Sequence, residues 1–327
     1  MRLLSAMRIV SAAVLVFAPL CVCAAAGGGA PAGAAAPSEI TIPGQGIFPE
    51  SLSSSADGRV FIGGIGSRSI FMAKAGASAA ETWIPADSDA ALGVYGVFAD
   101  EKNGTLWACF SSQKGADDTA TESVLRAFDL KTGKLKARYL MPKGAFCNDI
   151  AVGADRTAYV SDSGNMEIDR LVPGSDHLEA WATGGAFGPK GGILDGISVL
   201  GNRVFVNVLL TDKLFVVPIG ADGKAGAVAE VKLDRAINHP DGMRSFGSDS
   251  LLMIEGGGAG RLSLVKISGG SGHLTTLHEG YPQGPVAVTA VGKTAYVLEG
   301  QLSIHFGPNP GAPTQPFHAT AVSLPTQ

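Results

Sequence analysis

Apolar residues occur along this chain in short clusters separated by Gly, Asp and Asn, and they lack the three-to-four-residue spacing of long helices. The first clear example runs from Phe48 to Leu52, passes the turn Ala56-Asp57-Gly58 and ends in Arg59-Val60-Phe61-Ile62. Two β-strands joined by a tight turn have this pattern. The pair of clusters occurs six times, with starts at Phe48, Tyr95, Cys147, Leu194, Pro240 and Pro285.

These starts are separated by 47, 52, 47, 46 and 45 residues, and near-equal periods of this length are typical of propeller blades. A third apolar stretch, such as 214–217, follows each pair, and a weaker outer stretch, such as 135–139, has the polarity of an exposed edge. The pattern predicts an all-β fold, a six-bladed β-propeller of four-stranded antiparallel blades around a central channel. A β-helix would repeat at a shorter period, and a two-sheet sandwich would not repeat the same phrase six times.

An open ring would leave a long unpaired strand edge. We therefore expect the ring to be closed by residues 40–42 or by residues 319–322, paired with a terminal blade.

The N-terminal region has the pattern of an export signal. Arg2 and Arg8 give a positive start, a long apolar run follows, and small residues complete a signal peptide over 1–26. The apolar run, about fifteen residues, is shorter than the roughly twenty of a membrane-spanning helix. Residues 27–38 are almost wholly Gly, Ala and Pro and predict a flexible linker, and 39–327 form a single propeller domain. The predicted location is periplasmic or secreted.

Charge and cysteine content narrow the class of partner. The formal net charge is −4 and no basic run occurs, so we expect no nucleic-acid partner and no stable membrane insertion after signal cleavage. We expect a monomer that acts on a small molecule. Cys109 and Cys147 are the cysteines beyond the signal peptide, and composition leaves open a disulfide or two separate buried thiols.

Residues with oxygen-bearing side chains occupy the same place in four of the six repeats. Glu50, Asn148, Asp195 and Asp241 each stand at the opening of the first strand of a repeat. The first strand of a blade lines the central channel, so these side chains are expected to meet at one mouth of it. Asp-Gly and Asn-Asp also form ordinary turns, but their recurrence in phase favours a shared site.

Three carboxylates gathered in one place repel each other unless a cation lies between them. Oxygen ligands suit a hard divalent ion, which predicts one bound calcium, with magnesium, manganese or zinc as alternatives.

Four phrases in the chain resemble those of one family of six-bladed propellers: Pro49-Glu50-Ser51, Asn148-Asp149-Ile150, Asp195-Gly196-Ile197 and Pro240-Asp241-Gly242-Met243. The family is that of senescence marker protein, gluconolactonase and luciferin-regenerating enzyme, which is related to paraoxonases and strictosidine synthases. The resemblance covers about residues 40–310 in order and phase. It implies a single divalent metal, usually calcium, that polarises the carbonyl group of a lactone or the phosphoryl group of an organophosphate.

Carried over to this chain, the resemblance makes Glu50, Asn148, Asp195 and Asp241 the metal ligands. It makes Asp241 the catalytic base as well, with His239 as the alternative proton carrier. Asp195 departs from the family, which has asparagine before that glycine. The additional charge would tighten metal binding and lower the Lewis acidity of the ion.

The second strand of each blade returns to the same mouth, so its last residues can reach the pocket. We expect Asp162, Asn207, Glu255 and Glu299 to bind substrate there, although solvated rim positions have the same pattern. Cys109 ends a second strand and Cys147 opens the following first strand, which favours a disulfide between them.

Together these observations predict an exported, metal-dependent hydrolase of the gluconolactonase-like lactonase type. The alternatives are a non-catalytic, calcium-stabilised binding or scaffold propeller and a strictosidine-synthase-like enzyme, because fold does not decide function. The chain beyond the signal peptide has no Gly-x-Ser-x-Gly, His-Glu-x-x-His or phosphate-loop motif. The sequence does not identify the substrate.

Overall fold

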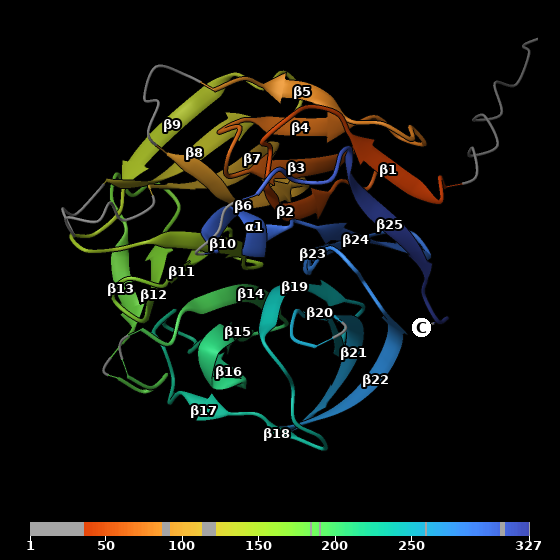
Figure 1. Ribbon diagram of the computed structural model, residues 1–327. Coiled ribbons are helices and arrows are strands. Elements are labelled where there is room, and N and C mark those ends of the chain that lie inside the picture. Colours follow the sequence, from red (N-terminus) through yellow and green to blue (C-terminus); the bar gives the residue numbers. More distant parts are fainter. Residues whose placement is uncertain are drawn as a thin grey trace, which may run out of the picture. The chain divides into compact units, whose positions relative to one another are not determined.

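The computed structural model describes residues 36–86, 92–112, 122–183, 185–189, 191–258, 260–307 and 311–326. The predicted signal peptide and residues 27–35 of the predicted linker lie outside these residues. The described residues form six small sheets arranged as blades around a centre (Figure 1). The predicted six-bladed propeller is confirmed. No helix in the described part of the chain has the length and apolar character needed to cross a membrane.

The strands of each blade run from the channel outward in chain order, except for the outermost strands of blades 5 and 6. Blade 1 consists of β2 (Pro49–Ser54), β3 (Val60–Gly64), β4 (Ile70–Ala73) and β5 (Glu81–Ile84), and blade 2 of β6 (Gly93–Asp100), β7 (Thr105–Ser111), β8 (Ser123–Asp129) and β9 (Leu135–Leu140). Blade 3 consists of β10 (Cys147–Val152), β11 (Ala158–Asp162), β12 (Glu167–Leu171) and β13 (Glu179–Ala182), and blade 4 of β14 (Leu194–Leu200), β15 (Arg203–Val208), β16 (Lys213–Pro218) and β17 (Ala229–Glu230). Blade 5 consists of β19 (Pro240–Phe246), β20 (Ser250–Glu255), β21 (Arg261–Ser268) and β22 (Ser271–Glu279), and blade 6 of β23 (Pro285–Val291), β24 (Thr294–Glu299), β25 (Phe317–Ser323) and β1 (Glu39–Ile42).

Two details go beyond the predicted pattern. Blade 5 has a fifth, short strand, β18 (Lys232–Leu233), which pairs in parallel with β22. The ring is closed by both of the segments that were expected as alternatives, because β1 pairs with β25 and β25 pairs with β24.

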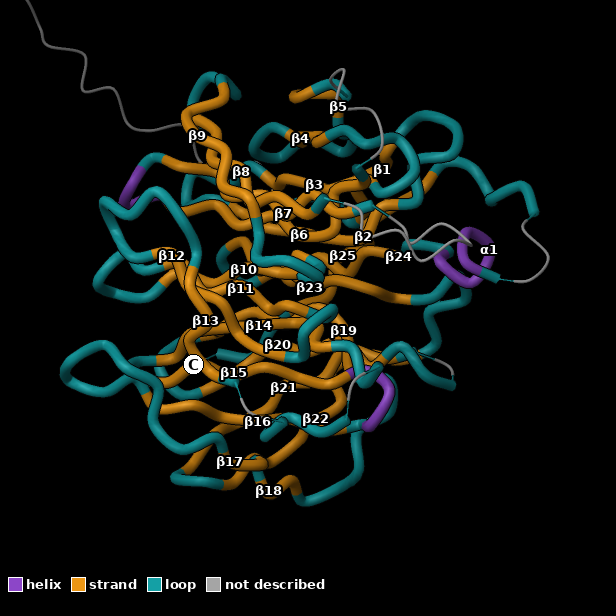
Figure 2. The backbone as a smooth tube through the Cα atoms, turned by 90° about the vertical axis from the view of Figure 1, so that its left-hand side faces the viewer, coloured by secondary structure: helices purple, strands orange, loops and turns teal. Residues whose placement is uncertain are grey.

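The hydrophobic core lies between neighbouring blades. Phe61 and Ile70 of blade 1, for example, pack with Val94 and Leu106 of blade 2. Few of the described residues are helical: η1 (Glu101–Asn103), η2 (Leu209–Thr211) and α1 (Leu302–Phe306). Figure 2 shows α1 and η2 at one end of the strands and η1 at the other. The end with α1 and η2 is the mouth at which the first strands begin.

Each of the six innermost strands has a β-bulge close to its first residue. A bulge adds an unpaired residue and redirects its side chain, and bulges are frequent beside functional sites. The bulged positions begin at Glu50, Tyr95, Asn148, Asp195, Asp241 and Val286. The repeat found in the sequence is therefore a repeat of this bulge.

Candidate metal centre

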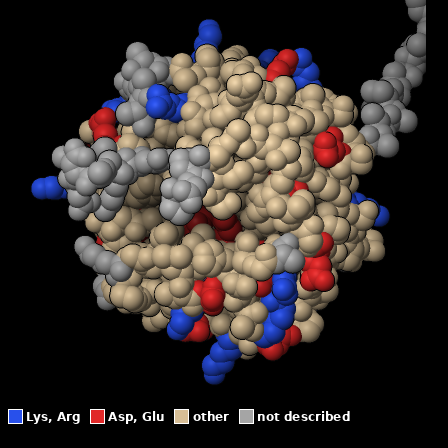
Figure 3. All heavy atoms as spheres, viewed as in Figure 1, with Lys and Arg blue, Asp and Glu red and all other residues tan. Residues whose placement is uncertain are grey.

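Three carboxylates from three blades meet at the mouth of the channel. Glu50 of β2, Asp195 of β14 and Asp241 of β19 each place one oxygen within 4.8 Å of the others. Glu50 and Asp195 are 8% and 5% exposed, and Asp241 is partly exposed. Figure 3 shows acidic side chains at the bottom of a central hollow whose surroundings carry few charges. The sequence prediction that these three residues converge agrees with this geometry.

The glycines in the Asp-Gly phrases allow neighbouring innermost strands to approach closely. A Cβ atom at position 196 would lie 2.4 Å from the carbonyl oxygen of Asp241, and one at position 242 would lie 2.7 Å from the carbonyl oxygen of Val286. Both distances are too short for any side chain. Each glycine thus lets the preceding carboxylate lie beside the next blade.

Asn148 supplies a fourth oxygen near Asp195. Its Nδ2 donates to Ser163 Oγ (3.0 Å) and to the carbonyl oxygen of Leu194 (3.3 Å), the residue before Asp195, and the Asn148 amide opposes the rise in the pKa of Asp195. Asn148 is 4% exposed, yet its Oδ1 atom has no hydrogen-bond partner. A buried acceptor without a donor is uncommon, and this oxygen is free to accept a bond from a ligand.

The pKa values of the three carboxylates show that positive groups do not balance their negative charge. Burial, followed by repulsion from Asp195, raises the pKa of both Glu50 and Asp241 well above the usual range. Burial and the negative charge of Asp149 raise the pKa of Asp195 to about 7. The carboxylates therefore share protons or bind a cation at neutral pH.

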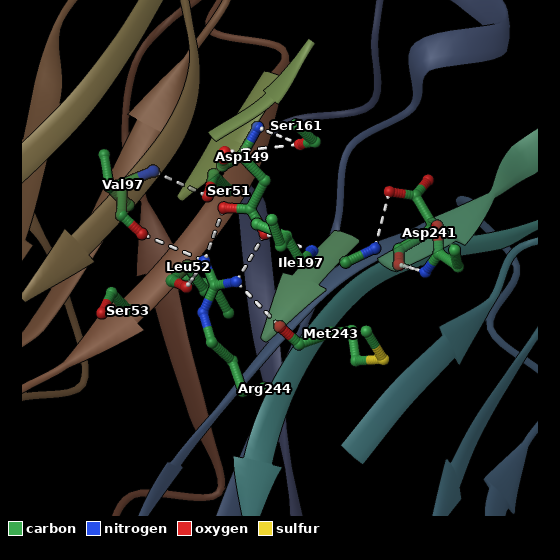
Figure 4. A network of polar contacts seen from close by, with 12 residues as sticks. Ser51, Leu52, Ser53, Val97, Asp149, Ser161, Ile197, Asp241, Met243 and Arg244 are labelled. Carbon is green, nitrogen blue, oxygen red and sulfur yellow. Dashed lines mark hydrogen bonds and ion pairs between the residues drawn. The ribbon is translucent and has the colours of Figure 1, made fainter. Parts of the chain in front are cut away.

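Directly beneath these acids lies a buried ion pair that the sequence analysis missed. Arg244 Nη1 and Nη2 donate to Asp149 at 2.6 and 3.1 Å (Figure 4). The same guanidinium donates to the carbonyl oxygens of Leu52, Val97 and Met243 at 2.8–3.0 Å. It thereby joins blades 1, 2, 3 and 5 below the site.

The sequence repeat contains a pattern from which the position of Arg244 in the channel could have been predicted. Arg244 lies three residues after Asp241, and the same offset gives Ser53 after Glu50 and Ser198 after Asp195, both of which are buried. Aligning the repeats at this offset would have placed Arg244 in the channel.

His239 lies at the mouth but makes few contacts. It is exposed and has a positive φ of 52°, and its backbone N–H donates to Asp212 Oδ1 at 2.7 Å. Its role as a proton carrier stays a prediction.

The predicted substrate-binding residues all lie at the ends of second strands and are at most 2% exposed. Asp162 Oδ1 accepts from the backbone N–H of Phe146, and Glu255 Oε2 accepts from that of Asn238. Glu299 Oε2 accepts from the N–H of Gln283. Each of these three carboxylates thus holds the loop that leads into the first strand of its own blade.

Asn207 differs from the three carboxylates, because its Nδ2 donates to the backbone carbonyl of Asp241 at 2.6 Å and its Oδ1 has no partner. It therefore supports a metal-site residue directly. Substrate binding by Asp162, Asn207, Glu255 and Glu299 stays a prediction.

The structure contains the disulfide between Cys109 and Cys147. It connects β7 of blade 2 to the first residue of β10 in blade 3, next to Asn148. Of the two possibilities that composition left open, the structure has the disulfide. The bond holds the strand that presents Asn148 against its neighbouring blade.

The donor set fits a calcium-type ion. Calcium takes oxygen ligands at 2.3–2.6 Å, so oxygens on opposite sides of the ion are about 5 Å apart, and the three carboxylate oxygens lie within 4.8 Å of one another. The hollow between them has a volume of about 10 Å³, room for about one water-sized sphere. Glu50, Asp195, Asp241 and the free Oδ1 of Asn148 would hold the ion.

No protein-family model and no curated protein sequence matches this chain. Solved structures do. A gluconolactonase from Xanthomonas campestris has 13% sequence identity and a TM-score of 0.61, covering 86% of this chain and 87% of its own. The calcium-binding protein regucalcin from Agrobacterium tumefaciens has 12% identity and a TM-score of 0.56, covering 88% and 97%. Virginiamycin B lyase from Staphylococcus aureus has 18% identity and a TM-score of 0.55, covering 80% of each chain.

The chain shares its propeller fold with these proteins. Gluconolactonase is one of the proteins that the sequence phrases resemble, so the structural comparison agrees with that resemblance at the level of the fold. The named neighbours include both a lactonase and a lyase, so the shared fold leaves the choice of reaction to the site.

Proposed function

We propose that this protein is a metal-dependent hydrolase of lactones or related esters, and that it belongs with the gluconolactonase-like propellers. The observation that supports it most is the meeting of three carboxylates around an ion-sized hollow at the channel mouth. The buried Oδ1 atom of Asn148, at the same bulged position of blade 3, has no hydrogen-bond partner. The proposed ion is calcium, with magnesium, manganese or zinc as alternatives. When bound there, the ion supplies Lewis acidity toward a substrate carbonyl oxygen.

In this proposal the residues of the chain have distinct roles. Asp241 Oδ1 accepts from the backbone N–H of Gly242 at 2.8 Å, which leaves Oδ2 to accept a proton from an attacking water. His239, at the entrance, is the alternative proton carrier. Ala287 and Val288 of blade 6 line the hollow beside the acids. They give the site an apolar side against which a ring can lie.

The experiment is a panel of lactones and esters assayed after chelation and after calcium, magnesium, manganese or zinc is restored. We expect chelation to abolish hydrolysis and one of the metals to restore it. Asp241→Asn is expected to lower kcat at least about 100-fold, the scale of a general base. The matched control is Asp222→Asn, in an exposed turn of blade 4, which should leave kcat unchanged. Hydrolysis that survives both chelation and Asp241→Asn would refute the proposal.

A second candidate, a calcium-stabilised binding or scaffold propeller, is favoured by one observation. Asp195 stands where an asparagine is expected, and a third carboxylate neutralises more of the charge of the ion. Asp195→Asn separates the two candidates. If the protein is an enzyme whose turnover is slowed by the charge of Asp195, the variant binds metal more weakly and hydrolyses lactones faster. If it is a scaffold, metal binding weakens and no lactone in the panel is hydrolysed by either form.

We also propose that the protein is exported through its signal peptide, residues 1–26, and acts as a monomer on a small molecule in the periplasm or outside the cell. Cell fractionation and the intact mass of the mature protein test export. A mature chain that retains residues 1–26 would contradict it.

A further inference from the structure

A second group of three carboxylates lies away from the channel, within blade 3. Asp162 ends β11, and Glu167 and Asp169 lie on β12. Asp162 is paired with Glu167 across the two strands, and Val160 is paired with Asp169. Side chains two residues apart on a strand share a face, so all three carboxylates lie on the same face of the blade. One oxygen of each lies within 4.8 Å of the other two.

This face of blade 3 is directed toward blade 2. Val160 and Leu171, which share the face with the acids, pack with Cys109 and Leu125 of blade 2. The acids therefore lie between two blades, beside an apolar cluster, in surroundings that solvate charge poorly.

Asp169 is the carboxylate whose negative charge has no compensating hydrogen bonds in this environment. It is 0% exposed, and neither of its two carboxylate oxygens has a hydrogen-bond partner. Asp162 is equally buried but well supplied, because its Oδ1 accepts from the backbone N–H groups of Phe146, Gly164 and Asn165 and its Oδ2 accepts from Asn165 Nδ2. A fully buried carboxylate without donors is costly unless something else compensates its charge.

Among the described residues, no basic side chain lowers the pKa of Asp169. Burial and the charges of Asp162 and Glu167 raise the pKa of Asp169 to about 8, and all three influences act in the same direction. Burial also raises the pKa of Asp162, in spite of its four donors.

We propose that Asp162, Glu167 and Asp169 form a second divalent-cation site, of the calcium class, that is separate from the channel site. Three carboxylate oxygens within 4.8 Å of one another fit the oxygen-rich, irregular coordination that calcium accepts, whereas magnesium needs a near-ideal octahedron. Asp162 is held in place by the loop that follows β11, so one ligand is fixed before the ion arrives. Glu167 is half-buried, which gives the ion and its remaining waters a route to solvent. The ion would join two strands of blade 3 at the face that packs on blade 2.

The test is a calcium titration of the full-length, chelator-treated protein at pH 8, in which isothermal calorimetry measures the number of ions bound and their affinities. We expect two ions per wild-type chain. Asp169→Asn should remove one ion and leave the channel ion, and Asp241→Asn should remove the channel ion and leave the other. Glu81→Gln, an exposed carboxylate on the outermost strand of blade 1, is the matched control and should retain both.

The Asp241→Asn variant decides the inference independently of the proposed enzymatic function. If that variant binds no calcium, the blade 3 acids hold only a shared proton and the inference is overturned. If Asp169→Asn retains the wild-type stoichiometry, it is overturned as well. Where Asp169→Asn does not yield folded protein, Glu167→Gln in the Asp241→Asn background decides. It should weaken the remaining calcium affinity at least about 10-fold, and unchanged affinity overturns the inference.

Discussion

Two sets of buried carboxylates lie at the same mouth of this propeller, and their surroundings differ. The channel carboxylates, Glu50, Asp195 and Asp241, open first strands. The loop-fixing carboxylates, Asp162, Glu255 and Glu299, close second strands. Burial is similar in the two sets: Glu50 and Asp195 are 8% and 5% exposed, and Glu255 and Glu299 are 1% and 2% exposed. Buried position alone therefore does not distinguish a ligand from a structural residue.

The supply of donors distinguishes them. Glu255 accepts from two guanidinium nitrogens of Arg235 (2.7 and 2.9 Å), from Ser263 and from a backbone N–H. Burial raises the pKa of Glu255, but Arg235 and Ser263 outweigh it, and the net shift is downward. Among the channel carboxylates burial and mutual repulsion dominate, and the pKa values rise. A buried carboxylate that the protein does not neutralise is the one available to a metal ion.

The largest expected effect concerns the cation below the channel carboxylates. Arg244→Met leaves Asp149 buried and unpaired, and loss of one partner of a buried pair costs about 3–5 kcal/mol. We expect the free energy of unfolding, measured by urea denaturation, to fall by this amount. The control is Lys74→Met, which removes an exposed ion pair with Glu81 and should change the free energy by less than about 0.5 kcal/mol. An Arg244 variant as stable as the control would show that Asp149 needs no partner.

Calcium should sharpen the comparison between the channel carboxylates and Glu299, because Glu299 belongs to neither of the two proposed calcium sites. An ion present at 100 times its dissociation constant stabilises its site by about 2.7 kcal/mol. Glu50→Gln should lose this contribution from the channel site, and Glu299→Gln should retain it. Thermal denaturation with calcium and with chelator measures both. Equal responses of the two variants would mean that the donor count does not separate the sets.

The same two sets should respond in opposite directions to loss of charge when no metal is present. Glu255→Gln removes the ion pair with Arg235 and should destabilise the protein by about 1–3 kcal/mol. Glu50→Gln removes repulsion from Asp195 and Asp241 and should leave the metal-free protein as stable as wild type or more stable. Chemical denaturation in chelator gives both free energies. Destabilisation of both variants to the same extent would contradict the comparison.

The smallest effect is a pH dependence within the loop-fixing set. The hydrogen bond from His318 Nε2 to Glu299 Oε1, 2.9 Å, raises the pKa of His318 above its unfolded value of about 6.5. The folded protein then binds this proton more tightly than the unfolded chain does. The stabilisation is complete below about pH 6.5 and is lost as the pH rises through the folded pKa. His318→Gln should remove this part of the pH dependence, as measured by unfolding from pH 5 to pH 9, and an identical profile for the variant would exclude it.

Much of the fold was predictable, because each repeat presents the same turn and apolar pattern. The predicted starts at Cys147, Leu194, Pro240 and Pro285 are the first residues of β10, β14, β19 and β23. The channel position of Glu50, Asp195 and Asp241 followed from the same phase. Period and phase are local properties of a sequence, so they can be found without coordinates.

The partners of these residues were not predictable in the same way. Arg235 and Glu255 lie 20 residues apart, and Arg244 and Asp149 lie 95 residues apart. Which carboxylate meets a cation depends on how neighbouring blades face one another. Asp169 illustrates the limit, because its alternation within β12 is visible in the sequence and its lack of any donor is not.

The pairing of β1 with β25 has a consequence for the order in which the ring can form during synthesis. β1 (Glu39–Ile42) leaves the ribosome before every other strand, and its partner, β25 (Phe317–Ser323), leaves after all of them. Until then β1 has only the short bridge between Thr41 and Ala79 beside it, and the edge of β24 is open. Unpaired edges of this kind associate with other chains. Ring closure is therefore a post-translational event that depends on nearly the whole chain. Chains released before residue 317 should aggregate, and a soluble monomer ending before that residue would refute this.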